Sequence, residues 1–182
     1  MKTYISILRG INVSGHKPIK MDALRRSYES LGFHNVRTYV QSGNVIFTAK
    51  DLGLSELSQK ILRQIEKDFN FEVPVVVLPV DKLKQIIDNN PFLNDPGKEP
   101  SFLHVTFLSS QPVKYDCKAI EDKKQNGEEI FIANDAVYLY CPKGYGNSKL
   151  NNNFLETKLK VVATTRNWKT TNELLKIAQQ PI

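Results

Sequence analysis

The chain has 182 residues, of which 41% are hydrophobic and 24% charged, an ordinary composition for a soluble globular protein. This length suits one mid-sized domain or two small ones, and it buries enough surface to fold without disulfides or a structural metal. The net charge of +6 leaves anionic partners open, whereas no apolar run is long enough to cross a bilayer.

The first half of the chain alternates between strand and helix patterns. Alternating apolar residues predict strands at 3–8, 35–41, 44–49 and 73–78, and helical spacing predicts helices at 21–31 and about 57–69. We expect Ser42-Gly43 to form a two-residue hairpin turn and Ser55 to cap the second helix. Pro74 predicts a sheet edge. This order of elements is the ferredoxin-like, or split β-α-β, pattern.

The second half of the chain begins in the same way. After a short helix at about 81–89 and a breaker-rich segment at 94–100, strands are predicted at 102–108, 129–133 and 136–141, with a short helix near 118–124. A glycine-rich loop at 143–149 and a helix near 150–158 follow. "TTRNW" (164–168) is expected to open the last helix, with Thr164 or Thr165 as its cap and Trp168 in the core.

These patterns together predict an α+β fold of two similar ferredoxin-like halves, with mainly antiparallel sheets and a helical C-terminal tail. The expected domains are an N-terminal half at 1–93 and a C-terminal half at 101–182, with the boundary near 94–100. The segments "VQSGNVIF" and "IANDAVYL" align with their turns superimposed, which supports two related halves.

Basic residues gather at the two ends of the chain. Residues 1–50 carry 8 Lys or Arg and 2 Asp or Glu, residues 51–142 carry 10 and 15, and residues 143–182 carry 7 and 2. The two ends therefore have net charges of +6 and +5 around an acidic middle of −5. One interpretation is ordinary solvated surface; the other is that both ends meet in space and attract an anion.

The segment "LRGINVSGHKPIKM" (8–21) nearly matches a phosphate-binding loop. Gly10, Gly15 and Lys17 approximate the pattern G-x-x-x-x-G-K-[ST]. That loop needs Ser or Thr directly after its lysine and a helix that starts there. Pro18 follows Lys17 here, and helical spacing begins only at Met21. The sequence therefore argues against a nucleotide-triphosphate loop.

The split β-α-β topology instead predicts a polar rim, because the loop after the first strand and the hairpin lie at the same end of the sheet. The candidate ligand-binding residues there are Arg9, Asn12, Ser14, Lys17, Gln41, Ser42 and Asn44. The basic C-terminal segment adds Lys143, Tyr145, Lys149, Arg166 and Asn167. We expect Arg166 and Asn167 at a helix N-terminus, where anions bind. The alternative is that these side chains only bond their own loops.

Three classes of function remain open. The favoured hypothesis is a cytoplasmic protein that binds an anionic or phosphorylated small molecule at this rim. The alternatives are a nucleic-acid-binding module, although Tyr4, Tyr39 and Phe47 are expected to pack within the sheet rather than stack bases, and a protein-interaction domain without a small ligand. No motif decides whether the protein is an enzyme, and the oligomeric state is open as well.

Several features exclude common alternatives. The three histidines, His16, His34 and His104, are scattered, and Cys117 and Cys141 form no C-x-x-C pair. The sequence therefore predicts no metal site and no cofactor, and it predicts two reduced thiols. Basic residues follow the first apolar run where a signal-peptide cleavage region would lie, which predicts a cytoplasmic protein.

Four sequence blocks resemble a bacterial family known as domain of unknown function 1697. The blocks are "LRGINVSGHKPIKM", "GFHNVRTYVQSGNVIF", "PKGYGNSK" and "TTRNW", in that order. The resemblance covers nearly the whole chain and implies an α+β protein with two similar halves. It implies no activity and no catalytic residue. The family's loop more often has glycine at the position of Ser14.

Overall fold

The computed structural model describes residues 1–181, and the chain divides into two compact units. Unit 1 comprises Met1–Lys84 and the C-terminal segment that begins at Leu174, and unit 2 comprises Gln85–Glu173. Helices α3 (Val80–Asp88) and α6 (Trp168–Ala178) each begin in one unit and end in the other. The expected domain boundary at 94–100 stays a prediction.

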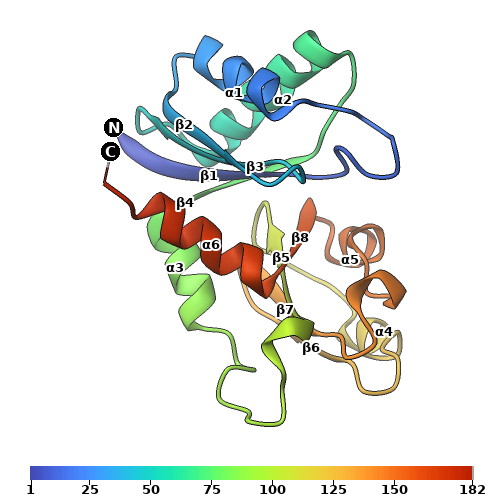
Figure 1. The fold of residues 1–182 in the computed structure, drawn as a ribbon. Helices are drawn as coiled ribbons and strands as arrows, with labels where there is room; N and C mark the ends of the chain where they lie inside the picture. The colour runs from blue at the N-terminus through green and yellow to red at the C-terminus, as the bar shows by residue number, and fades with distance from the viewer. Residues whose placement is uncertain (182) are drawn as a thin grey trace. The chain divides into compact units, whose positions relative to one another are not determined.

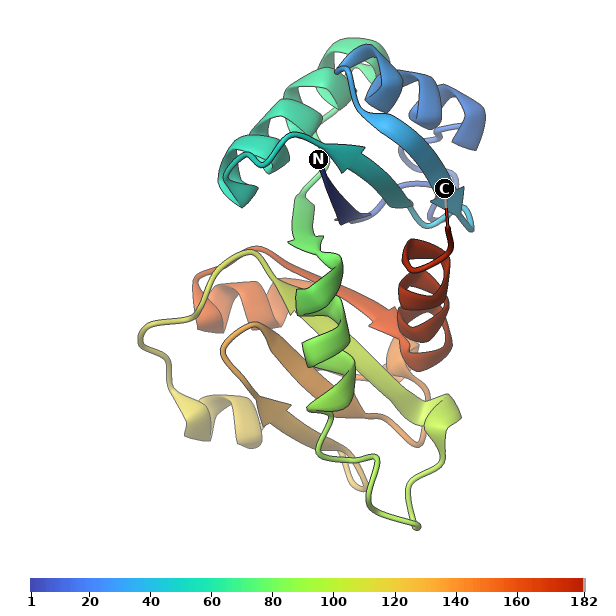
Figure 2. The same cartoon turned by 90° about the vertical axis from the view of Figure 1, so that its left-hand side faces the viewer.

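Unit 1 is a four-stranded antiparallel sheet with two helices on one face (Figures 1 and 2). Its elements are β1 (Lys2–Leu8), α1 (Met21–Ser30), β2 (His34–Tyr39), β3 (Asn44–Ala49), α2 (Leu54–Phe69) and β4 (Val75–Pro79). The strand order β2-β3-β1-β4 is the split β-α-β order. Strand β4 lies at an edge, as Pro74 predicts, because proline cannot donate to a second neighbouring strand.

Unit 2 repeats this topology. After a short 3-10 helix at Pro100–Phe102, its elements are β5 (Leu103–Leu108), α4 (Cys117–Glu121), β6 (Glu129–Ile132), β7 (Ala136–Tyr140), α5 (Asn152–Leu159) and β8 (Ala163–Asn167), with a second 3-10 helix at Tyr145–Asn147. The strand order is β6-β7-β5-β8, and all pairs are antiparallel. The predicted α+β fold of two ferredoxin-like halves is confirmed.

Both units anchor the end of their first strand in the same way. Backbone N–H groups there donate to both neighbouring segments: Leu8 to Gly43 (2.8 Å), Arg9 to Pro74 (3.0 Å), Leu108 to Asp135 (3.2 Å) and Ser109 to Val162 (2.9 Å). The loop that follows each first strand therefore starts from a fixed point beside the hairpin of its own unit.

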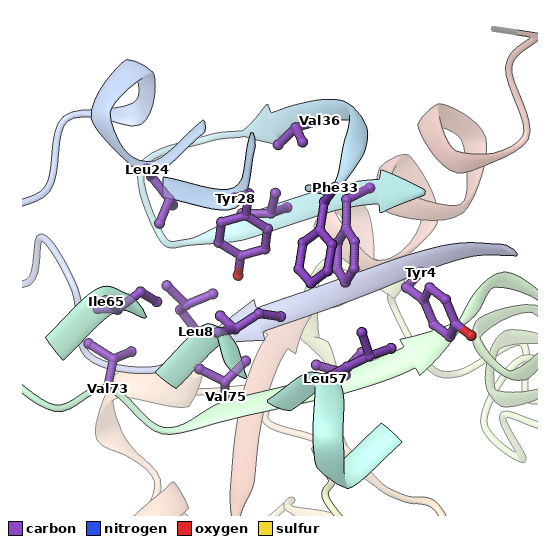
Figure 3. Packing of buried hydrophobic residues seen from close by; sticks show 14 of the residues in the cluster. Tyr4, Leu8, Leu24, Tyr28, Phe33, Val36, Leu57, Ile65, Val73 and Val75 are labelled. Atoms are coloured by element: carbon purple, nitrogen blue, oxygen red, sulfur yellow. The ribbon is translucent and has the colours of Figure 1, made fainter. Parts of the chain in front are cut away.

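The core of unit 1 lies between the sheet and its helices (Figure 3). Phe33 and Phe47 stack with ring centroids 4.6 Å apart, and Tyr28 meets Phe47 edge-on at 5.5 Å, arrangements that aromatic rings favour. The Tyr28 hydroxyl is 2.7 Å from Ser6 Oγ, and burial raises the pKa of Tyr28. Tyr4 is also buried in this layer, so Tyr4 and Phe47 pack within the protein as expected.

The hairpin turn of unit 1 differs from the prediction. Strand β2 ends at Tyr39, which pairs with Asn44, so the connection spans 40–43 rather than the two residues Ser42-Gly43. Val40 and Gly43 adopt positive φ angles of 50° and 82°. Left-handed backbone at both ends of the connection ends the pairing of β2 with β3 at Tyr39. The alternating pattern of 35–41 does not predict these left-handed residues.

Two predicted helix starts also need correction. Helix α2 begins after Gly53, so Ser55 lies inside the helix and does not cap it. Residues 163–167 form strand β8 rather than the start of a helix, because they pair with β5. Helix α6 begins at Trp168, which is half-buried rather than in the core. Its cap is Asn167, whose Oδ1 accepts from the Thr170 N–H at 2.8 Å, so neither Thr164 nor Thr165 caps it.

Gly43 is expected to be the glycine least tolerant of substitution. A Cβ there lies 2.7 Å from Leu8 Cβ and 2.8 Å from Ile11 Cδ1, and φ is +82°. We expect Gly43→Ala to lower the free energy of unfolding by about 3 kcal/mol, from overpacking and backbone strain together. Gly10→Ala is the matched control, because φ is +76° with nothing within 4 Å of its Cβ. Equal urea-denaturation midpoints for the two variants would contradict the packing argument.

Candidate functional site

Asn12 holds the loop after β1 against the hairpin. Its Nδ2 donates to the carbonyls of Ile19 and Gln41, both at 2.9 Å, and its Oδ1 accepts from the Ile19 N–H at 2.8 Å. Asn12 adopts φ +54°, a left-handed conformation that asparagine tolerates. The amide is used within the chain, so Asn12 shapes the predicted rim instead of offering a donor to a ligand.

Lys17 is also bound within unit 1. Its Nζ donates to the Glu72 carbonyl at 2.6 Å and lies 6.0 Å from the centre of the Phe71 ring. The lysine therefore ties the loop before α1 to the segment that follows α2. Ser14 is exposed at φ +49°, a left-handed conformation that glycine adopts most readily.

The hairpin residues are brought together by Asn44. This side chain is fully buried, and its Nδ2 donates to the Tyr39 carbonyl at 3.0 Å and to Ser42 Oγ at 2.9 Å. Strand pairing sets Ile7 opposite Asn44, and Arg9 follows two residues later, half-buried. Asn44 therefore closes the hairpin against the end of β1.

A hollow of about 320 Å³ lies between this loop and the hairpin. Its lining residues are Asn12, Pro18, Ile19, Lys20, Met21 and Gln41. Helix α1 starts at this hollow, and Lys20 at its N-cap position makes no capping hydrogen bond through its side chain. Uncapped N–H groups at a helix start attract anions. The hollow therefore combines a lysine, a side-chain amide and a helix N-terminus.

The sequence did not single out Lys20. The available signal is its position directly before the predicted helix start at Met21, where a side chain lies beside the free N–H groups. Asp22, in the first turn of α1, is an opposing charge. Its carboxylate lies 3.9 Å from the Arg25 guanidinium and is not part of the lining.

Tyr145, one of the candidate residues of unit 2, joins a cluster of buried hydroxyl groups. Thr165 Oγ1 donates to Asn152 Oδ1 at 2.7 Å and accepts from the Tyr145 hydroxyl at 3.1 Å. Thr106 Oγ1 lies 2.7 Å from Thr165 Oγ1. Because the Thr165 hydroxyl donates its single proton to Asn152, Thr106 is the donor in this bond. This arrangement ties the glycine-rich loop to strands β5 and β8.

His104 packs against the glycine-rich loop through the ring of Tyr145. The two rings stack with centroids 5.0 Å apart and an interplanar angle of 24°. His104 Nδ1 lies 3.2 Å from the Phe102 carbonyl, so Nδ1 carries the proton in the neutral ring. Burial lowers the pKa of His104, and the hydrogen bond to Phe102 opposes this effect. The imidazole is therefore neutral at pH 7.

Arg166 lies in strand β8, not at a helix N-terminus as predicted. Its NH1 donates to the Thr165 carbonyl at 2.9 Å, and burial lowers the pKa of the guanidinium to about 10. Asn167 does lie at a helix start, but its side chain caps α6. Lys143 and Lys149 are exposed on the glycine-rich loop.

The candidate residues near the N-terminus and those near the C-terminus lie in different units. Each set also lies at a different end of the sheet of its own unit. The residues of unit 1 follow the carboxyl end of β1, whereas His104 lies near the amino end of β5 and pairs with Asn167. Among residues 1–181, no group of three or more His, Cys, Asp or Glu side chains is arranged to hold a metal ion. No helix in this range combines the length and apolar character that crossing a bilayer requires.

The sequence and fold were compared with known proteins. The family model described as "Protein of unknown function (DUF1697)" matches residues 1–138. The chain belongs to this family. The DUF1697 match includes the loop after β1 and the hairpin of unit 1 and ends within β7, so the glycine-rich loop and β8 lie outside the matched segment.

A solved structure has the same fold. The conserved bacterial protein SP0830 from Streptococcus pneumoniae is 21% identical to this chain with a TM-score of 0.71, and the alignment covers 98% of this chain and 99% of that one. At this identity the likeness supports the fold alone. No functionally curated protein matches the chain.

The structural role of Asn12 leads to a test of the loop. We expect Asn12→Ala to lower the free energy of unfolding by about 2–4 kcal/mol, because three hydrogen bonds to backbone groups of Ile19 and Gln41 are lost and alanine resists a positive φ. Amide exchange at Ile19 should accelerate at the same time. Asn35→Ala is the control, because Asn35 has φ +53° but makes only a 3.4 Å bond to Thr48. An unchanged exchange rate at Ile19 would show that the loop holds without Asn12.

The buried imidazole leads to a pH prediction. Burial lowers the folded-state pKa of His104 below its ordinary value of 6.5. Between the folded-state pKa and 6.5, the unfolded chain therefore binds more protons than the folded chain. The stability contributed by neutral His104 is complete above pH 6.5 and is lost as the pH falls through 6.5 toward the folded pKa. His104→Phe, which keeps a ring beside Tyr145, should flatten the dependence of unfolding midpoint on pH between 7 and about 5.

The exposed His34 is the matched control for this experiment, and His34→Gln should retain the wild-type dependence. A pH dependence in His104→Phe equal to that of the wild type would refute the assignment.

Proposed function

We propose that this protein binds an anionic or phosphorylated small molecule at the polar rim of unit 1. The observation that carries the proposal is the hollow between the loop after β1 and the hairpin, which Lys20 and Gln41 line beside the uncapped start of α1. An ammonium group, an amide N–H and a helix N-terminus all favour a phosphate oxygen.

The surroundings of the hollow support a preformed site. Asn12 closes the loop through two hydrogen bonds with Ile19 and joins it to the hairpin through a third, to the Gln41 carbonyl. Asn44 fixes the hairpin itself. Donors held by a rigid scaffold lose little entropy when a ligand binds. The excess of basic residues in the first 50 positions adds a favourable long-range field.

A cytoplasmic location is part of this proposal. Cys117 is exposed and Cys141 buried, and neither forms a disulfide, which suits a reducing compartment. Fractionation of cells that express the full protein tests the location, and recovery from an oxidising compartment would contradict it.

A thermal-shift screen at low salt with inorganic phosphate, nucleotides and sugar phosphates tests the binding proposal. We expect at least one phosphorylated compound to raise the unfolding temperature of the wild type, and Lys20→Ala/Gln41→Ala to lose most of this shift because both donors are removed. Lys50→Ala/Gln59→Ala changes the same residue types at exposed positions outside the hollow and should keep the shift.

Two results would refute the proposal. One is that no phosphorylated compound stabilises the wild type at millimolar concentration, and the other is that both double variants lose the shift equally.

A further inference from the structure

In unit 1 the loop before α1 is bonded to the segment that follows α2, beside a hollow of about 580 Å³ between α1 and the end of α2. The loop at 9–20 leads into α1, and the segment at 70–74 connects α2 to β4. Lys17 from the loop donates to the Glu72 carbonyl at 2.6 Å and lies over Phe71. The chain itself therefore supplies both the cation and its acceptor at this place.

Unit 2 also has a hollow at the corresponding place. Both connections are shorter there, with 109–116 before α4 and 160–162 between α5 and β8. A hollow of about 470 Å³ remains, lined by Lys114, Tyr115, Asp116, Thr157, Lys158 and Lys160. The two connections are joined through Ser109, whose N–H donates to the Val162 carbonyl at 2.9 Å and whose Oγ accepts from the Val162 N–H at 3.1 Å.

The charges that line this hollow are not balanced. Among residues 1–181, Lys114, Lys158 and Lys160 form no ion pair with a carboxylate. The lining carboxylate, Asp116, is engaged as the cap of α4, because its Oδ1 accepts from the Ala119 N–H at 3.0 Å. Three lysines thus line one hollow with a single acidic residue, an arrangement that an anion stabilises.

A fourth lysine lies close to the same helix. Lys123 Nζ and Lys158 Nζ lie 5.8 Å and 5.9 Å from the centre of the Phe154 ring. The ring holds the two aliphatic side chains against α5, which limits their freedom. Lys123 therefore adds a positive charge close to Lys158, which lines the hollow.

We propose that the hollow between α4 and α5 binds a small polyanion with two or more phosphate groups. A single exposed ion pair contributes little to binding, so ammonium groups spread around an open hollow favour a ligand that contacts several of them at once. The Tyr115 ring packs against the core and forms a wall of the hollow. Asp116, Glu121 and Asp122 interrupt the basic surface along the chain, which disfavours a long nucleic-acid track.

Isothermal titration of the full chain at low salt with tripolyphosphate tests this proposal, with Lys158→Gln/Lys160→Gln as the test variant. We expect the affinity of this variant to fall roughly tenfold or more, because two charge-assisted contacts are lost. The control Lys50→Gln/Lys169→Gln removes the same charge at exposed positions outside the hollow and should keep the wild-type affinity.

Three results would overturn the proposal. The first is that tripolyphosphate does not bind the wild type, and the second is that both variants lose affinity equally, which indicates general charge attraction. The third is that a long oligothymidylate binds more tightly than tripolyphosphate and loses affinity in the test variant, which identifies single-stranded nucleic acid as the partner. The proposal is independent of the hollow in unit 1, because neither Lys20 nor Gln41 contributes to it.

Discussion

The central position of the first strand constrains the rest of each unit. Strand β1 pairs with β3 on one side and β4 on the other, and β5 does the same with β7 and β8. At the end of β1, the Leu8 N–H reaches Gly43 and the Arg9 N–H reaches Pro74. The loop that follows therefore begins in a fixed place beside the hairpin. A side chain at Gly43 would separate these segments, so one small residue permits the contact on which the candidate site depends.

Two similar units with different loops show where function resides in this fold. The strand order and the anchoring bonds are the same in both units, and they serve only to bring chain segments together. In unit 1 a long loop uses Asn12 and Lys17 to bind itself to its surroundings. In unit 2 shorter connections leave lysines around an open hollow. The scaffold is shared, and the loops supply the chemistry.

The periodicity of the sequence predicts the topology because strand and helix patterns come from burial on one face. The start of the last helix was predicted wrongly for a physical reason. Thr-Thr-Arg-Asn resembles a helix cap locally, but the segment extends as β8 because it pairs with β5, where Thr165 lies opposite Thr106. A partner that is distant in sequence overrides a local preference. The end of β2 at Tyr39 was also missed by local reasoning. Val40 adopts a left-handed backbone conformation, and an alternating sequence pattern does not predict such a conformation.

The predicted rim shows a different limit of sequence reasoning. Residue type identifies a potential donor, but not whether the chain itself uses that donor. Asn12, Lys17 and Asn44 all bond to carbonyl groups of their own unit, and they make rigid walls rather than contacts to a ligand. Of the predicted donors, Gln41 lines the hollow, together with Lys20, which the sequence did not single out. Exposed donors bind weakly one at a time, so selectivity at such a site must come from the number and spacing of charges on the ligand rather than from enclosure.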